Sequence, residues 1–344
     1  METITRDQTV KSTYIIFEAG LNHNGSPKLA EELVRAAALH GADAVKFQKR
    51  SITALANREM LASEESRFPS LGKTYQEVRE KLELDFRAYC DLRDMSYQLG
   101  LDFMVTPFDE ESLDFIMNVG VDAVKIASHS VAHPRLLDKV SEVSVPVFMS
   151  SGMVTLQELD VAMGIFEEHK EFTLLHCSSE YPTSNTGANL RLIPFLRERY
   201  QRPVGFSSHE LGTSHSIAAV ALGATTLERH VTLDKTLEGF DHKMSLAAEE
   251  FGLLVGQVRE IEVAMGRAVK EISPEEQRTR DKYRVSMVAS RDVSAGEALT
   301  AEMISYKNPG TGMPASAEAT YLGRTLKNSV PFDSLLKPEH FEKA

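Results

Sequence analysis

With 344 residues, the chain is long enough for one large domain with a small one, or for two domains of medium size. Its 42% hydrophobic and 26% charged residues are typical of a soluble globular protein, and no apolar run is long enough to span a bilayer. The formal net charge of −12 argues against a general nucleic-acid binder, because phosphate contacts need clustered Lys and Arg side chains.

Cysteine usage and the N-terminal residues give an expectation for the compartment. Cys90 and Cys177 are too few for a disulfide framework, which suits a reducing environment. Residues 1–7 lack the basic start and apolar core of a signal peptide. We therefore expect a cytoplasmic protein.

Short apolar or β-branched runs alternate with amphipathic segments, which is typical of repeated βα units around a parallel sheet. Between the first two runs, Ser26 and Pro27 predict the start of a helix, as N-cap and first helical residue. The predicted strands are 14–17, 44–47, 102–105, 123–126, 146–149, 172–176, 204–207 and 226–229. Eight units by about residue 265 match a closed (β/α)8 barrel, with an open doubly wound sheet as the competing architecture.

One internal repeat connects two of these strands. The sequence GADAVK at 41–46 returns as GVDAVK at 120–125, so predicted strands two and four both end in a lysine of equal phase. Even-numbered strands share side-chain layers in such barrels. Lys46 and Lys125 are therefore expected to point into one mouth, where they would suit an anionic substrate.

The composition changes after Ala264. We predict a barrel domain at 1–268, a polar and charged linker at 269–282, and a small domain of short strands and turns at 283–344. Within the small domain, 285–289 is a predicted strand, and Gly296 and Pro309 mark turns.

Polar side chains follow every predicted strand, at the barrel end where the working residues of this fold lie. Any one of them could be an ordinary helix cap or turn residue, but all eight strands ending this way indicates a site. The candidates drawn from these ends are Glu18, Asn22, Lys46, Gln48, Thr106, Lys125, Ser128, Ser150, Ser179, Tyr181, Ser207, His209 and His230.

Two histidines form the strongest candidate metal pair. His209 and His230 end the adjacent strands seven and eight, and two imidazoles can hold a divalent transition metal while leaving positions open for water or substrate. The alternative is that both rings hydrogen-bond to loops. His23 and His176 are weaker candidates. The sequence has no phosphate-binding glycine loop of the P-loop or Rossmann kind, so we expect no nucleotide cofactor.

At these residues the chain resembles the sialic acid synthase family, the phosphoenolpyruvate-dependent synthases of nonulosonic acids. The matching segments are EAGLNHNG (18–25), KFQ (46–48), KIAS (125–128), HCSSEYP (176–182), GFSSH (205–209), LERH (227–230) and GFDH (239–242). VSAG (293–296) and PGTG (309–312) resemble the antifreeze-like (SAF) domain that follows the barrel in this family.

The resemblance implies roles for particular residues. His209 and His230 would hold a divalent metal, most commonly Mn²⁺, with Mg²⁺ or Co²⁺ as alternatives. Glu18 and Asp241 would contact the acceptor sugar or move protons, and Glu18 is our candidate acid–base group. The phosphate and carboxylate of phosphoenolpyruvate would be held by Lys46, Thr106, Lys125, Ser128, Ser150 and Ser207, with Gln48, Asn22, Ser179, Tyr181 and Asn308 as further substrate contacts.

The resemblance also implies a reaction and an assembly. Carbon 3 of phosphoenolpyruvate would attack the aldehyde carbon of an open-chain sugar, and phosphate would be released. Family members work as homodimers in which the small domain of one chain covers the barrel of the other.

Two positions depart from the family pattern. Ser130 stands where the family usually carries an acidic residue, and Asn308 stands where it usually has an arginine that reaches the acceptor's N-acyl group. Residues 72–75 (GKTY) resemble the branch that takes phosphorylated acceptors. We hypothesise an acceptor other than N-acetylmannosamine, either phosphorylated or differently acylated.

Three other functions remain open at this stage. A metal-dependent pyruvate aldolase or lyase could use the same barrel without phosphoenolpyruvate. A seven- or eight-carbon keto-acid synthase resembles the barrel but lacks the small domain. A catalytically altered carbohydrate-binding homologue is the non-enzymatic alternative.

Overall fold

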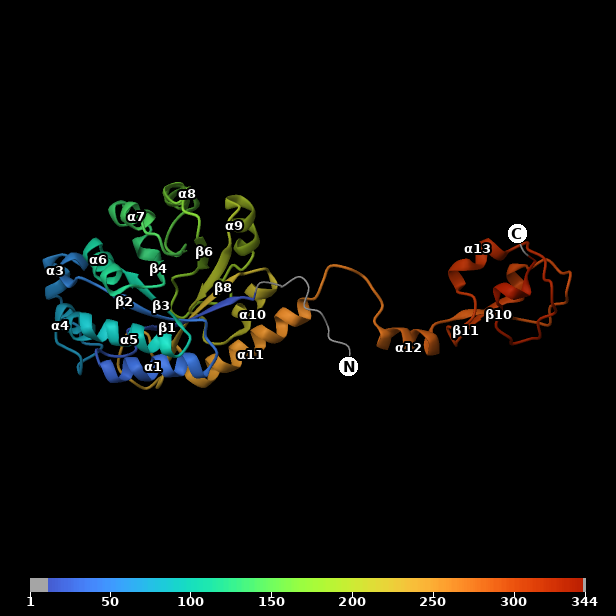
Figure 1. Ribbon diagram of the computed structural model, residues 1–344, viewed down its shortest axis with the longest axis horizontal. Coiled ribbons are helices and arrows are strands. Elements are labelled where there is room, and N and C mark those ends of the chain that lie inside the picture. The colour runs from blue at the N-terminus through green and yellow to red at the C-terminus, as the bar shows by residue number, and fades with distance from the viewer. Residues whose placement is uncertain (1–11, 343–344) are drawn as a thin grey trace. The chain divides into compact units, whose positions relative to one another are not determined.

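The computed structural model describes residues 12–342, which divide into two compact units. The first unit ends at Gly266 and the second begins at Arg267, and each is described here by itself (Figure 1). Residues 1–7, on which the signal-peptide prediction rests, lie outside the described residues. Within 12–342, no helix is long and apolar enough to cross a membrane.

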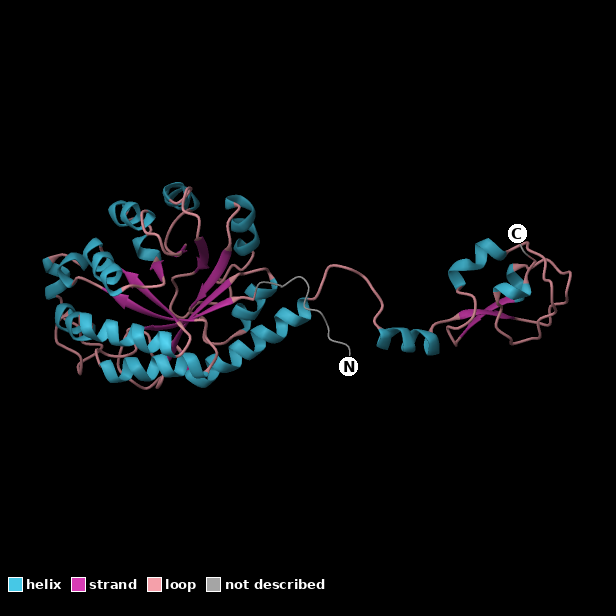
Figure 2. Cartoon of the chain, in the orientation of Figure 1, coloured by secondary structure: helices cyan, strands magenta, loops and turns pink. Residues whose placement is uncertain are grey.

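The first unit is a closed barrel of parallel strands surrounded by helices (Figures 1 and 2). Each strand pairs with the next along the chain, and β1 also pairs in parallel with β8, where Glu18 is in register with His230. This last pairing confirms the predicted (β/α)8 barrel and excludes the open sheet. The barrel strands are β1 (Tyr14–Gly20), β2 (Ala44–Lys49), β3 (Asp102–Pro107), β4 (Ala123–Ile126), β5 (Val147–Ser150), β6 (Phe172–Cys177), β7 (Val204–Ser208) and β8 (Thr226–Thr232). A short β9 (Leu246–Ala247) pairs with the end of β8.

The helices begin where the sequence offers a side-chain cap. Ser26 accepts a hydrogen bond from the backbone N–H of Leu29, and Pro27 opens α1 as predicted. Asn57, Thr74, Asp85, Asp109 and Thr155 cap later helices in the same way. The helices of this unit are α1 (Pro27–Leu39), α2 (Ile52–Leu55), α3 (Arg58–Ala62), α4 (Tyr75–Leu82), α5 (Phe86–Gln98), α6 (Glu110–Val119), α7 (Pro134–Ser141), α8 (Leu156–Ile165), α9 (Leu192–Tyr200), α10 (Ser214–Ala221) and α11 (Ala248–Met265), with a 3₁₀ turn η1 (Ser128–Ser130).

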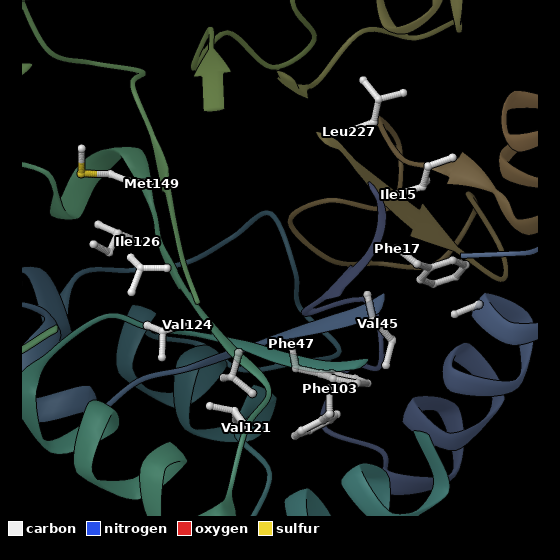
Figure 3. Packing of buried hydrophobic residues seen from close by; sticks show 14 of the residues in the cluster. Ile15, Phe17, Val45, Phe47, Phe103, Val121, Val124, Ile126, Met149 and Leu227 are labelled. Carbon is white, nitrogen blue, oxygen red and sulfur yellow. The ribbon is translucent and has the colours of Figure 1, made fainter. Parts of the chain in front are cut away.

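Strand alternation separates two kinds of buried layer. Residues such as Ile15, Phe17, Val45, Phe47 and Phe103 point out of the barrel and pack under the helices (Figure 3). Their strand neighbours point inward. The inward residues at the amino-terminal half of the strands form an apolar layer of Ile16, Ala44, Met104, Ala123, Phe148 and Leu175.

The next inward residue along each strand lies one layer higher. The charged residues Glu18, Lys46 and Lys125 lie two positions after Ile16, Ala44 and Ala123 on the same strands. The apolar layer therefore closes the barrel directly beneath charged side chains. The internal repeat therefore places its two lysines as predicted, in one layer and facing the same interior.

The second unit has a separate core built on two antiparallel strands, β10 (Ser286–Ala289) and β11 (Ile304–Lys307). Its shorter elements are η2 (Ala301–Met303), η3 (Ala315–Ala317), α13 (Glu318–Tyr321) and η4 (Pro338–His340). The predicted linker contains a helix, α12 (Pro274–Tyr283), which starts at a Ser273 cap and buries no side chain. Local signals alone explain this helix, because acidic residues fill its first turn and basic residues its last.

Phe251 on α11 is the anchor between that helix and the barrel wall. Its fully buried ring meets Phe17 edge to face, with 5.0 Å between the ring centroids. We expect Phe251→Ala to lower the free energy of unfolding of the barrel by about 3–5 kcal/mol in urea titrations, because a buried aromatic ring is replaced by a cavity. Leu253→Ala is the matched control, since that side chain is 69% exposed on the same helix. Equal effects of the two substitutions would contradict this packing.

Candidate active site

A cavity of about 220 Å³ opens at the carboxyl ends of the barrel strands. Every one of the eight strands contributes to its wall. The predicted residues brought together in the wall are Glu18, Lys46, Gln48, Thr106, Lys125, Ser128, Ser150, Tyr181, Ser207, His209, His230 and Asp241.

The floor of the cavity holds two lysines and two carboxylates, all nearly inaccessible to solvent. The Nζ atom of Lys46 lies 2.7 Å from Glu18 Oε2 and donates a hydrogen bond to Thr106 Oγ1 at 2.9 Å. The Nζ atom of Lys125 donates to Ser150 Oγ at 2.7 Å. Both ammonium groups lie 3.7 Å from the carboxylate of Glu228, which therefore bridges them.

The charged groups of this floor shift one another's pKa. Burial, together with the like charge of Lys46, lowers the pKa of Lys125 below its ordinary value despite the attraction of Glu228. Burial alone would raise the pKa of Glu228, but Lys125 and Lys46 more than offset it, so the pKa lies below the usual range and Glu228 stays ionised. Two cations are thus balanced internally by two carboxylates, in a place where an anionic ligand can reach both lysines.

Glu228 is the main functional residue that sequence reasoning missed. The sequence predicts a polar end for strand eight, and His230 is the candidate site residue that it gives there. Strand alternation was the available signal, because Glu228 and His230 are two residues apart and must face the same way. Arg229 between them faces outward and forms a buried ion pair with Glu210 Oε1 at 3.0 Å, which ties the loop after β7 to β8.

His209 and His230 lie side by side in the wall, with 5.5 Å between their ring centroids. The Nδ1–H of His209 donates to the carbonyl oxygen of Ser178 at 2.9 Å, which leaves its Nε2 with a free lone pair. Burial and the neighbouring His230 lower the pKa of His209 to about 4, so this ring is neutral at physiological pH. The Nδ1 of His230 is buried, has no hydrogen-bond partner among residues 12–342, and lies 3.8 Å from Asp241 Oδ2.

These two rings fit the first ligands of a divalent transition metal. Within residues 12–342, no group of three or more His, Cys, Asp or Glu side chains has metal-binding geometry. Any ion held here would keep further coordination positions for water or substrate. His176 is committed elsewhere, since its Nε2 lies 2.8 Å from the carbonyl oxygen of Ala188. The Nδ1 of His23 accepts from the backbone N–H of Gly25 at 3.0 Å.

Three residues that were predicted to contact the substrate are not among those that line the cavity. The structure places Asn22 outside the cavity wall, where its amide N–H groups donate to the carbonyl oxygen of Val231 and to Ser245 Oγ. Ser179 is half-buried, and its inaccessible hydroxyl oxygen lies beside Gly152 and Ser128, so close that a Cβ on Gly152 would collide with both hydroxyls. Asn308 belongs to the second unit, so its predicted contact with the acceptor remains a prediction.

Several wall residues were not selected from the sequence. Arg50, Arg79 and Phe240 line the cavity together with Phe108, His129 and Met153. Ser130, which departs from the family pattern, is buried, and its hydroxyl oxygen lies 2.8 Å from His129 Nδ1. Arg50 could have been found, because it continues the inward phase of Lys46 and Gln48 at the end of β2.

Comparison with known proteins agrees with this architecture and identifies the family. Residues 33–270 match the NeuB family, and residues 284–342 match the SAF domain. The chain belongs to the NeuB family. The resemblance to sialic acid synthases is thereby confirmed.

Relatives match over nearly their full length. N,N'-diacetyllegionaminic acid synthase of Campylobacter jejuni is 34% identical, with 95% of this chain and 100% of that protein covered. N-acetylneuraminate-9-phosphate synthase of Mus musculus is also 34% identical, with 96% and 92% covered. The crystal structure of an N-acetylneuraminic acid synthetase from Leptospira borgpetersenii has a TM-score of 0.69 at 32% identity, covering 78% of this chain and 90% of that one. These relatives are acid synthases, and they are therefore enzymes.

The bridging carboxylate gives a prediction for stability. We expect Glu228→Gln to lower the free energy of unfolding by about 3–5 kcal/mol at neutral pH, because two buried ammonium groups lose a shared counter-charge. Urea titration followed by circular dichroism measures the change. Glu198→Gln on α9 is the control, since that side chain is exposed and little change is expected. If the two variants unfold alike, Glu228 does not balance the lysines.

Proposed function

We propose that this protein condenses phosphoenolpyruvate with an aldehyde sugar to give a nonulosonic (sialic-type) acid and inorganic phosphate. The observation that carries the proposal is the pair of buried lysines, Lys46 and Lys125, bridged by Glu228 at the floor of the barrel cavity. The names of the full-length relatives support it.

Phosphoenolpyruvate has two anionic ends, a phosphate and a carboxylate. Each lysine brings a hydroxyl partner, Thr106 for Lys46 and Ser150 for Lys125, so the floor offers two cationic positions with neighbouring donors. Ser128 and Ser207 add hydroxyl groups to the same wall. A ligand with one anionic group would leave one of these positions unused.

The proposed reaction forms one carbon–carbon bond and breaks one carbon–oxygen bond. Carbon 3 of phosphoenolpyruvate attacks the aldehyde carbon, and the aldehyde oxygen takes up a proton to become a hydroxyl group. Water adds to the electron-poor carbon 2 and gives up a proton. The C2–O bond to phosphate then breaks, the phosphate leaves with the bonding electron pair, and the C2 hydroxyl loses its proton to form the ketone.

In this proposal, Glu18 handles the proton of the attacking water. Its carboxylate is buried in the wall, 2.7 Å from the Lys46 ammonium group, and Gln48 Nε2 donates to its other oxygen at 2.5 Å. These two contacts fix the orientation of the carboxylate, as general acid–base catalysis requires. Asp241 lies on the His230 side of the wall and is the second candidate for contact with the acceptor.

His209 and His230 are the residues that would hold a divalent ion, with Mn²⁺ as the first candidate and Mg²⁺ or Co²⁺ as alternatives. When bound, such an ion supplies Lewis-acid polarisation of the aldehyde oxygen. The ring of Tyr181 packs against His209 at a centroid distance of 4.0 Å and shields this side of the pair. The homodimer that the family resemblance implies remains a prediction. Light scattering, which measures the molar mass in solution, can test it.

The proposal is tested by measuring phosphate release from phosphoenolpyruvate with Mn²⁺ and a panel of free, 6-phosphorylated and differently acylated hexoses and hexosamines. We expect release that depends on an acceptor and stops when the metal is chelated. A pyruvate aldolase would instead use pyruvate and release no phosphate. A carbohydrate-binding protein would bind sugars without consuming phosphoenolpyruvate. Either result would overturn the proposal.

The metal pair gives a prediction with a direct binding readout. We expect His209→Ala and His230→Ala each to lose detectable Mn²⁺ binding in calorimetry, because each removes one of two protein ligands. His169→Gln is the control, since that imidazole lies before β6, at the opposite end of the barrel. Undiminished binding in both alanine variants would remove the metal assignment.

The role of Glu18 gives a prediction for turnover. We expect Glu18→Gln to lower kcat by about 10²- to 10⁴-fold, which is the usual contribution of a positioned acid–base group. Steady-state phosphate release measures it. Glu180→Gln, at an exposed carboxylate after β6, is expected to keep normal turnover. A Glu18→Gln variant as active as Glu180→Gln would exclude the acid–base role.

A further inference from the structure

A second cationic region lies in the same cavity, on residues other than those of the lysine floor. The guanidinium of Arg50 stacks over the ring of Phe108, with its Cζ 3.7 Å from the centroid. The guanidinium of Arg79, from α4, stacks over Phe240 at 4.0 Å. Stacking fixes the plane of each group, so both are preorganised for bidentate contact with an anion.

The hydrogen-bonding capacity of the two arginines is not used up. Arg50 is only 6% exposed, yet its Nη1 has no hydrogen-bond partner within residues 12–342. The Nε of Arg79 is likewise buried and unpartnered in the part of the chain that the structure describes, where Arg79 also has no ion pair. Buried donors without partners are costly, and a ligand that accepts from them removes that cost.

One carboxylate forms a loose ion pair with this region, without a hydrogen bond to the guanidinium group. The closest to Arg50 is Glu83, whose Oε1 is 4.0 Å from Nη1 and therefore beyond hydrogen-bond distance. The other oxygen of Glu83 is taken by Lys49 Nζ at 2.7 Å and by the backbone N–H of Arg50 at 3.2 Å. Burial and the charge of Arg79 lower the pKa of Arg50 to about 10, and the carboxylates of Glu83 and Asp241 offset only part of that shift.

The cationic region is connected to the reaction centre. Arg50 Nη2 donates to Gln48 Oε1, and Gln48 Nε2 donates to Glu18. Lys46, Gln48 and Arg50 follow one another in the inward phase at the end of β2, so Arg50 lies about 13 Å beyond Lys46 along the strand direction. A six-carbon sugar in its open-chain form has its aldehyde at one end and carbon 6 at the other, which suits a cavity with two separated polar ends.

We propose that Arg50 and Arg79 form an anion subsite that binds a phosphate group on the end of the acceptor remote from its aldehyde. The acceptor is then a hexosamine or hexose 6-phosphate. This inference rests on the proposed function. A neutral acyl or hydroxyl group would leave Glu83, 4.0 Å from Arg50, as the counter-charge of the two guanidinium groups, whereas a phosphate can accept hydrogen bonds from both. The phosphate and carboxylate of phosphoenolpyruvate are already met by Lys46 and Lys125.

The first measurement compares kcat/KM for N-acylhexosamines with and without a 6-phosphate, in the full-length wild-type protein. We expect a preference for the phosphorylated acceptor of about 10- to 100-fold, the range of one or two charge-assisted hydrogen bonds. We further expect Arg79→Gln and Arg50→Gln to reduce this ratio at least tenfold. Arg50→Lys keeps the charge but loses the planar guanidinium group. We expect this variant to retain part of the preference for the phosphorylated acceptor.

Arg67→Gln is the matched control. Arg67 also lies over Phe240, at 5.5 Å, but its guanidinium is paired with Glu65 and it is not part of the cavity wall. We expect the Arg67→Gln variant to have the same ratio of kcat/KM for phosphorylated and unphosphorylated acceptors as the wild type.

An inhibition experiment on the wild-type protein tests the subsite without any variant, so it does not depend on how the variants fold or turn over. Glucitol 6-phosphate has no aldehyde and cannot react, and glucitol differs from it only by the phosphate. We expect glucitol 6-phosphate to inhibit the wild type competitively against the acceptor, and glucitol and inorganic phosphate to do so far more weakly.

The outcomes separate this inference from the proposed function. Phosphate release with neutral acceptors at equal or higher kcat/KM, together with no inhibition by glucitol 6-phosphate, overturns the subsite and leaves the synthase function intact. An unchanged ratio in both glutamine variants also overturns it. Failure of every acceptor to release phosphate overturns the proposed function itself.

Discussion

The active-site cavity depends on one interaction, the sharing of the Glu228 carboxylate between the buried ammonium groups of Lys46 and Lys125. Two like charges in a low-dielectric interior would repel each other and shift toward neutrality. Glu228 offsets part of this repulsion for both lysines, and Glu18 adds a second carboxylate beside Lys46. An anion that enters this floor therefore meets a site in which charge and hydrogen-bond donors are already in place, so little reorganisation accompanies binding.

Closure of the barrel makes this arrangement possible. The apolar layer around Ile16, Ala44 and Ala123 fills the interior below the charges and excludes water from that side. Pairing of β1 with β8 then brings Glu18 into register with His230, although the two residues are more than two hundred positions apart in the chain. The acid–base candidate and the metal-ligand candidate thus belong to neighbouring strands only because the sheet closes.

The cavity has two polar ends with different chemistry. The floor uses lysines, which are compact charges suited to small anions between several hydroxyl donors, whereas the upper part uses arginines held flat against aromatic rings. Gln48 connects the ends through its contacts with Glu18 and Arg50. If a group of the acceptor binds at Arg50 as proposed, it would influence how the Glu18 carboxylate is held and so couple acceptor recognition to the reacting atoms.

Much of the fold follows from the sequence by itself. All eight barrel strands were predicted, because each is a short apolar run between amphipathic segments, and the Ser26–Pro27 start of α1 is a local backbone signal. The GADAVK and GVDAVK repeat was enough to place Lys46 and Lys125 in one layer, since strand period and barrel symmetry fix side-chain direction. The helix α12 inside the predicted linker also had local signals, but its fully exposed surface gave no apolar pattern to recognise.

Only the tertiary structure decided which polar residues meet. Closure of the sheet, and not spacing, excluded the open alternative and brought Glu228 between lysines from two other strands. Asn22 shares its segment with Glu18, yet its amide is turned to β8 and holds the backbone there. Arg79 comes from α4 in the long connection between β2 and β3, so no strand pattern predicts its place over Phe240. Side-chain contacts between distant segments depend on packing, which a linear pattern does not encode.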